Sequence, residues 1–129
     1  MTIIHVVLFE WKPTASSDQI SEACKQMLAL KDKCIHPTSQ KPYIKSFSGG
    51  KNNSPEGHSV CPPSWPASTF NSVAYAHKGN FTHGFVVEFE SEEDRDYYIY
   101  KDPAHQDFVK LAGEMANGVK VLDYEPGKL

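Results

Sequence analysis

Three histidines and a pair of tyrosines are the residues of this chain best suited to chemistry. His5 and His83 lie within runs of β-branched and aromatic residues, and His105 lies where a helix is expected to begin. The pKa of an unperturbed histidine is about 6.5, so near neutral pH a neutral imidazole is available to accept a proton. A tyrosine hydroxyl, such as that of Tyr97 or Tyr98, can donate or accept a hydrogen bond. Such groups suit general acid–base chemistry.

Each histidine also has a structural interpretation. A strand histidine often hydrogen-bonds to a neighbouring strand, which would account for His5 and His83, and His105 could act as a helix cap. A metal site would need further ligands, but no carboxylate or thiolate stands at a characteristic ligand spacing, and the three cysteines form no Cys-x-x-Cys pair. The sequence therefore predicts no metal ion. It leaves open whether the imidazoles face one cavity.

Composition restricts the classes of partner. The chain has 129 residues, 40% of them hydrophobic and 22% charged, which is typical of one globular domain. A net charge of -3 without a basic cluster argues against nucleic acid. The apolar segment 3–9 is too short to span a membrane and lacks the features of a secretory signal. Unpaired cysteines fit a reducing compartment, so a cytoplasmic protein is expected.

Four strands are expected, at residues 3–9, 43–47, 81–89 and 119–124. These segments are rich in β-branched and aromatic residues and end at prolines, glycines or acidic residues. The segment 81–89 gives the clearest pattern. Each segment is short enough to be a strand in a small sheet.

Three helices are expected between these strands. The first runs from a cap at 16–18 to about residue 33, with apolar residues at helical spacing. The second begins with Ser91 as the N-cap of a capping box and ends before Asp102. The third begins at Pro103 and ends at the Asn-Gly pair 117–118. This order predicts an α+β domain with a four-stranded antiparallel sheet and its helices on one face.

The stretch 51–79 does not fit this pattern. It is rich in proline, asparagine and serine, has no periodicity, and is longer than most loops of compact domains. We interpret it as an irregular insertion in a single domain that spans residues 1–129. It could be a genuine lid or loop, a disordered segment or a translated retained intron, since codons for Val60-Cys61 could encode a fungal-type splice donor.

The second face of the sheet also needs a cover. Large apolar residues on the strands would leave a patch that is too large to face water in a monomer. A two-fold dimer that packs sheet on sheet would bury it. A homodimer is therefore expected.

Four segments together give a family resemblance. They are His-Val-Val-Leu-Phe at 5–9, the strand and turn Phe-Thr-His-Gly-Phe-Val-Val-Glu-Phe-Glu-Ser at 81–91, Asp-Pro-Ala-His at 102–105 and Leu-Asp-Tyr at 122–124. In combination they resemble the stress-responsive A/B barrel (Dabb) domain family of the dimeric α/β barrel superfamily. The resemblance implies a ferredoxin-like homodimer with a cleft between the sheet and the helices of each protomer.

The chain is similar to the olivetolic acid cyclase type of polyketide cyclase within this family. That similarity implies a cofactor-free aldol closure with His105 as the catalytic histidine and His5 and His83 in the substrate pocket. It also implies a partner tyrosine, for which Tyr98 is chosen and Tyr97 remains possible. This chain departs from the pattern by one extra residue between that tyrosine and the proline, and by an aspartate where a histidine commonly precedes the proline.

The resulting hypothesis is a cofactor-independent enzyme of cyclase or lyase type that acts on a small polyketide or phenolic substrate. The main alternative is a non-catalytic stress-response or ligand-binding homodimer with structural histidines. A further alternative is a cofactorless monooxygenase, by analogy of fold alone. A small apolar or phenolic molecule is the expected ligand in the first two cases.

Overall fold

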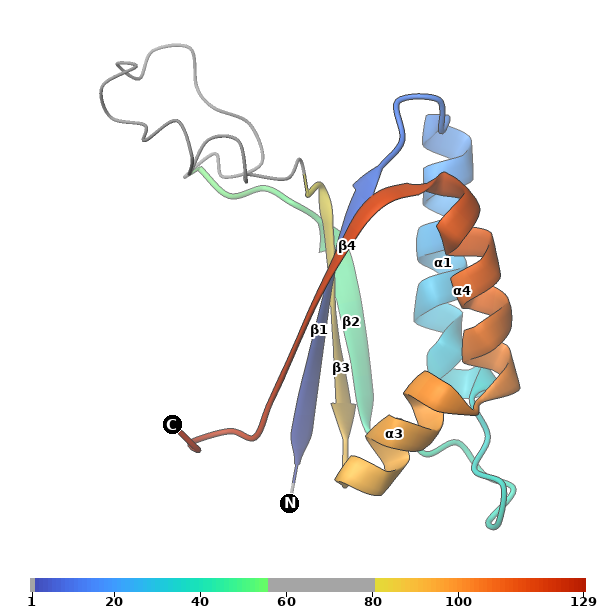
Figure 1. The fold of residues 1–129 in the computed structure, drawn as a ribbon, viewed down its shortest axis with the longest axis vertical. Coiled ribbons are helices and arrows are strands. Elements are labelled where there is room, and N and C mark those ends of the chain that lie inside the picture. The colour runs from blue at the N-terminus through green and yellow to red at the C-terminus, as the bar shows by residue number, and fades with distance from the viewer. Residues whose placement is uncertain (1, 56–80) are drawn as a thin grey trace.

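A computed structural model describes residues 2–55 and 81–129 of the chain. They form an antiparallel sheet of four strands in the order β2-β3-β1-β4, with all three helices on one side (Figure 1). The elements are β1 (Ile3–Trp11), α1 (Ser17–Lys33), β2 (Ser46–Lys51), β3 (His83–Phe89), α3 (Glu92–Tyr100), α4 (Pro103–Met115) and β4 (Ala116–Tyr124). This topology is ferredoxin-like and confirms the predicted α+β class.

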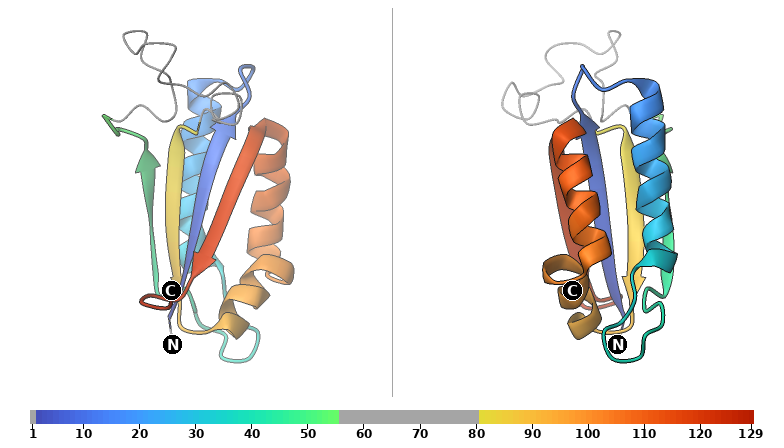
Figure 2. Two further views of the ribbon diagram at one scale, coloured as in Figure 1. Left: turned by 60° about the vertical axis from the view of Figure 1, so that its left-hand side comes forward. Right: turned by 90° about the vertical axis from the view of Figure 1, so that its right-hand side faces the viewer.

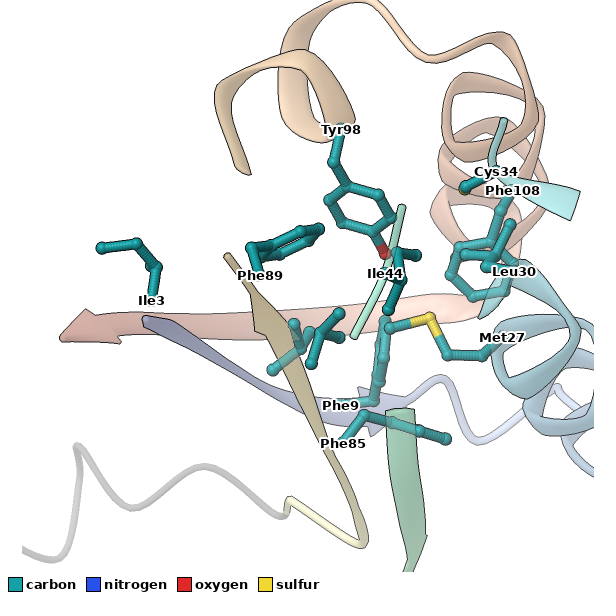
Figure 3. Packing of buried hydrophobic residues seen from close by; sticks show 13 residues of the cluster. Ile3, Phe9, Met27, Leu30, Cys34, Ile44, Phe85, Phe89, Tyr98 and Phe108 are labelled. Atoms are coloured by element: carbon teal, nitrogen blue, oxygen red, sulfur yellow. The ribbon is translucent and has the colours of Figure 1, made fainter. Parts of the chain in front are cut away.

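Alternation along the central strand β1 determines which of its side chains face the helices. Its alternate residues, including Ile3, His5 and Phe9, are buried beneath the helices. In the register of the sheet, His5 lies opposite Val87 of β3 and Asp123 of β4. The core fills the layer between this face and the helices (Figures 2 and 3).

The predicted helix starts are present, with one correction. Ser16 and Gln19 form a complete capping box at α1. Ser91 caps α3 and accepts a hydrogen bond from the Asp94 amide, but the structure shows no return bond there, so the predicted capping box at Ser91 is wrong. The aspartate side chain is one methylene shorter than the glutamate or glutamine of a capping box.

The boundaries of β2 differ from the prediction. The strand does not end at residue 47 but continues through Gly49 and its neighbour to Lys51. A Cβ atom at Gly49 would lie 2.1 Å from Cδ1 of Phe85, so glycine lets that ring pack directly over the strand. Tyr43, predicted to lie in this strand, instead precedes it and directs its hydroxyl to Asp102.

The last strand begins earlier than predicted. The Asn-Gly pair 117–118 lies inside β4, because α4 passes directly into β4 between Met115 and Ala116. The Ala116 amide donates to Ala112 O, and the Lys12 amide donates to Met115 O at 2.8 Å. These bonds satisfy the end of the helix without a loop.

Two other strands differ at their ends. β1 extends to Trp11, two residues beyond the prediction, and β3 begins at His83 instead of residue 81. Lys51 pairs with His83, so the two ends of the β2–β3 connection lie next to each other. The predicted insertion 51–79 otherwise lies largely outside the described residues. No helix in the described parts of the chain is long and apolar enough to cross a membrane.

The outer face of the sheet carries exposed apolar side chains. Leu8 and Val86 stand on β1 and β3, and Leu122 and Tyr124 stand on β4. Leu122 is 64% exposed. The helices cover the opposite face only (Figure 2), so the outer face has the apolar character that the sequence predicts.

Candidate active site

An apolar cavity of about 360 Å³ lies between the sheet and the helices. This volume is near the lower end of the range for small-molecule sites, roughly 300–1,000 Å³. The only polar side chains that line it, among the described residues, are those of His5 and His105. The full lining comprises His5, Val7, Phe9, Met27, Ile99, His105, Phe108, Val109, Ala112, Gly113, Ala116, Val119 and Val121.

A carboxylate on the adjacent strand holds His5. The imidazole is 4% exposed, and its Nδ1 lies 2.6 Å from Oδ1 of Asp123. A carboxylate only accepts hydrogen bonds, so Nδ1 carries a proton, and in the neutral ring Nε2 then has the lone pair. The bond therefore sets both the orientation and the tautomer of a ring that lines the cavity.

An arginine holds the other oxygen of this carboxylate. Nη1 of Arg95, on α3, donates to Oδ2 of Asp123 at 3.0 Å, and Nε of Arg95 donates to Asp96 at 2.6 Å. The carboxylates of Asp96 and Asp123 raise the pKa of Arg95. The sequence interpretation did not single out Asp123 or Arg95. The available signal was that Asp123 shares the helix-facing side of its strand with Val119 and Val121.

Tyr98 and His105 pack against each other. Their ring centroids are 3.9 Å apart with an interplanar angle of 31°, and the His5 ring meets Tyr98 edge-on at 5.8 Å. Tyr98 is fully buried and reaches from α3 into the core (Figure 3). Its hydroxyl has no hydrogen-bond partner, and burial, with the nearby Cys34 and Asp102, raises its pKa. The structure thus brings together His5, Tyr98 and His105.

His105 is neutral at physiological pH. Burial lowers its pKa to about 4, and repulsion by His5 adds to the effect. Its Nδ1 is buried without a hydrogen-bond partner. An imidazolium can therefore form here at neutral pH only next to a compensating negative charge.

This shift predicts an acid-dependent loss of stability. The unfolded pKa of about 6.5 exceeds the folded value of about 4, so the unfolded chain binds more protons between these values. The free energy of unfolding should fall as pH decreases from 6.5 to 4, by up to roughly 3 kcal/mol from this residue. Urea denaturation of the wild type and His105→Gln across this range should show a flatter profile for the variant. Parallel profiles would contradict the assignment.

Two residues predicted for the site lie elsewhere. His83 accepts a hydrogen bond from Trp11 Nε1 at 3.0 Å and lines a separate cavity of about 520 Å³ between α1 and strands β2 and β3. Burial and Lys51 lower its pKa. Tyr97 packs instead against Tyr43, with ring centroids 5.7 Å apart. Of the two candidate tyrosines, Tyr98 is therefore the one in contact with His105.

Asp102 fixes the start of α4, three residues before His105. It is 1% exposed, and its Oδ1 accepts from the Ala104 amide at 2.9 Å. Its Oδ2 accepts from the Tyr43 hydroxyl at 2.6 Å, and burial together with this aspartate raises the pKa of Cys34. The aspartate that departs from the family pattern thus has a structural role. The described residues contain no group of three His, Cys, Asp or Glu placed to bind a metal ion.

Comparisons with known proteins agree with this architecture. A model of the family described as Stress responsive A/B Barrel Domain matches residues 3–74 and 65–126. A search among curated proteins gave no match. The crystal structure of At3g17210 from Arabidopsis thaliana has 27% sequence identity and a TM-score of 0.67, covering 98% of this chain and 97% of that chain.

Two more distant structures share the fold. Hydroxynitrile lyase from Passiflora edulis has 19% identity and a TM-score of 0.66, with 99% of this chain and 96% of that chain covered. A dimeric ferredoxin-like protein from Thermobifida fusca has 18% identity and a TM-score of 0.62, with 96% and 90% covered. These likenesses confirm the predicted ferredoxin-like fold.

Proposed function

The chain belongs to the stress responsive A/B barrel domain family, and we propose that it is a cofactor-independent enzyme acting on a small polyketide or phenolic substrate. The observation that carries this proposal is the apolar cavity to which residues 2–55 and 81–129 contribute two imidazoles as polar side chains. An apolar lining of this kind strengthens electrostatic interactions and limits the choice of proton acceptor. The lyase in the comparisons is consistent with the fold supporting such chemistry.

The proposed reaction begins with proton transfer to His105. The imidazole removes a proton from a carbon between two carbonyls, and the electron pair of the C–H bond moves into an enolate. The enolate carbon then attacks a distant carbonyl carbon of the same chain, and the new alkoxide takes the proton back from His105. Although its pKa is low in the empty cavity, the adjacent enolate charge favours the imidazolium.

His5 would bind and orient the substrate. Because its Nδ1–H bonds to Asp123, its Nε2 is a hydrogen-bond acceptor. Such an acceptor binds the hydroxyl of an enol or a phenol, which both proposed substrate classes present. Roles for His83 and Tyr97 stay predictions, and His83 would require a ligand that reaches the second cavity.

Tyr98 does not itself line the cavity but packs against His105, which does. Its proposed role is to donate a hydrogen bond to the enolate oxygen, and this role predicts a trade-off. Its hydroxyl is buried and unpartnered, which costs about 1–3 kcal/mol in the folded protein. Tyr98→Phe should therefore raise the free energy of unfolding by about 1 kcal/mol while lowering kcat by about tenfold or more. Chemical denaturation and rate assays would measure the two effects. A destabilised variant with unchanged kcat would contradict the role.

The proposed function can be tested before the natural substrate is known. A simple 1,3-diketone in deuterium oxide would report α-proton exchange by NMR, and a linear tetraketide thioester would report cyclisation. Wild-type protein should accelerate exchange above the buffer rate, and His105→Ala should not. Equal rates for the two proteins would exclude His105 as the base. Saturable ligand binding without exchange or turnover would favour the non-catalytic alternative.

We also propose that the protein is a homodimer that buries the outer face of the sheet. The exposed apolar side chains on β1, β3 and β4 support this interface, and the Thermobifida fusca relative is dimeric. Sedimentation equilibrium should give twice the chain mass of 14.4 kDa. Leu122→Glu should shift the protein to monomer, because it would bury paired carboxylates; a variant that remains dimeric would place the interface elsewhere.

A further inference from the structure

We propose that Arg95 is a positioning residue that acts on His5 through Asp123. The inference rests on the proposed function, in which His5 binds substrate through Nε2. Three elements contribute one residue each to a continuous chain of hydrogen bonds: α3 provides Arg95, β4 provides Asp123 and β1 provides His5. The chain runs from the helix across the edge of the sheet to the cavity.

The geometry divides the two oxygens of Asp123 between two donors. Arg95 occupies Oδ2 at 3.0 Å, and His5 occupies Oδ1 at 2.6 Å. The side chains of Arg95, Asp123 and His5 are 19%, 22% and 5% exposed, so water has limited access to the chain. With Oδ2 occupied, the carboxylate cannot rotate freely about its terminal torsion, and Oδ1 stays aimed at His5.

An arginine at position 95 provides a permanent positive charge and also fixes the direction of its hydrogen bonds. A guanidinium remains protonated at any physiological pH and offers several donors in a fixed plane. Nε of Arg95 is bonded to Asp96, which leaves Nη1 directed at Asp123. The other titratable groups that face His5 are His105 on α4 and Tyr98 on α3. Asp123 is thus the acceptor for the Nδ1 proton of His5, and Arg95 occupies the other oxygen of that acceptor.

Histidine-selective ¹⁵N NMR tests this inference on the intact protein without substrate. The wild type should show a protonated Nδ1 and a bare Nε2 for His5, with a slowly exchanging Nδ1 proton. In Arg95→Gln, exchange of that proton with water should accelerate at least about tenfold, the factor that corresponds to losing one hydrogen bond between charged groups. Arg95→Lys, which keeps the charge, should recover part of the protection. Lys31→Gln, on the exposed surface of α1, removes the same charge and should leave the signal unchanged.

The outcomes separate this inference from the proposed function. An unchanged His5 tautomer and proton exchange rate in folded Arg95→Gln would overturn the role of Arg95, whatever the activity. If Arg95→Gln does not fold, Arg95→Lys alone decides: exchange at His5 that is faster than in the wild type supports the role of Arg95, and wild-type exchange overturns it. A failed diketone assay with the expected NMR result would reject the enzyme proposal and keep the positioning role.

Discussion

Replacing His105 with alanine is expected to lower kcat by about 10²–10⁴-fold, the usual contribution of a general base. The side chain is one of two polar side chains that the described part of the chain places in the cavity, and burial keeps it neutral at the pH at which a base must act. KM should change little, because the proton is transferred only in the transition state. Steady-state kinetics on the diketone or the tetraketide thioester would measure both constants.

A second histidine provides the matched control. His36 lies outside the cavity, and its Nδ1 accepts from the amide of Thr38. His36→Asn preserves a local acceptor for that turn and should keep kcat within about twofold. Circular dichroism would establish that both variants are folded. An equal fall in kcat for the two variants would show that the loss is not specific to His105.

Replacing Asp102 with alanine is expected to have the largest effect on stability, a loss of about 2–4 kcal/mol. Loss of an N-cap costs about 0.5–2 kcal/mol, and the Tyr43 hydroxyl would lose its partner at a further cost of about 1–3 kcal/mol. Relief from burying the charge offsets part of this cost. Urea denaturation would measure the change, and a fraying α4 would also displace His105.

Two smaller changes separate these contributions. Asp102→Asn keeps a capping oxygen for Ala104 but places an amide NH2 group where Oδ2 stood, so the Tyr43 hydroxyl can only accept from it; the loss should be about 1 kcal/mol. Tyr43→Phe removes the other partner and leaves the cap in place, with a similar loss. If Asp102→Ala lost less than either of these two variants, the aspartate would not anchor α4.

Local chemistry predicts most of the fold of this protein. A helix begins where the amides of its first turn find acceptors or are absent. The side chains of Ser16, Ser91 and Asp102 accept hydrogen bonds from such amides, and Pro103 has no amide hydrogen. The periodicity of β-branched residues likewise identifies β1 and β3. Both signals act within a few residues, so they are readable without the tertiary structure.

The incorrect boundaries depend on contacts between distant segments. β2 continues through Gly49 because Phe85, from another strand, covers it. β4 begins at Ala116 because the amide of Lys12 reaches the last turn of α4. Glycine and Asn-Gly pairs usually favour turns. Only the partner segment shows that they serve close packing here.

The candidate site also combines features that local sequence predicts with features that depend on contacts between distant segments. The sequence leaves open whether His5 and His83 face one cavity, because alternation within a strand does not give their separation along the sheet. The register pairs His83 with Phe9, four residues from His5, or about 13 Å at 3.3 Å per residue. Alternation also cannot identify Arg95, because its contact with Asp123 depends on how α3 crosses the sheet.

The direct passage from α4 into β4 gives the cavity one end of fixed width. Gly113 and Ala116 line that end, and the neighbouring carbonyls of Ala112 and Met115 are bonded to main-chain amides. Gly113 is exposed, and a Cβ atom there would have open space around it, so this end of the cavity opens to solvent. The main-chain bonds fix the rim of the opening, whereas side chains elsewhere in the wall can change rotamer. A substituent that projects through this end of the cavity should therefore be tolerated better than one of the same size placed elsewhere on the ligand.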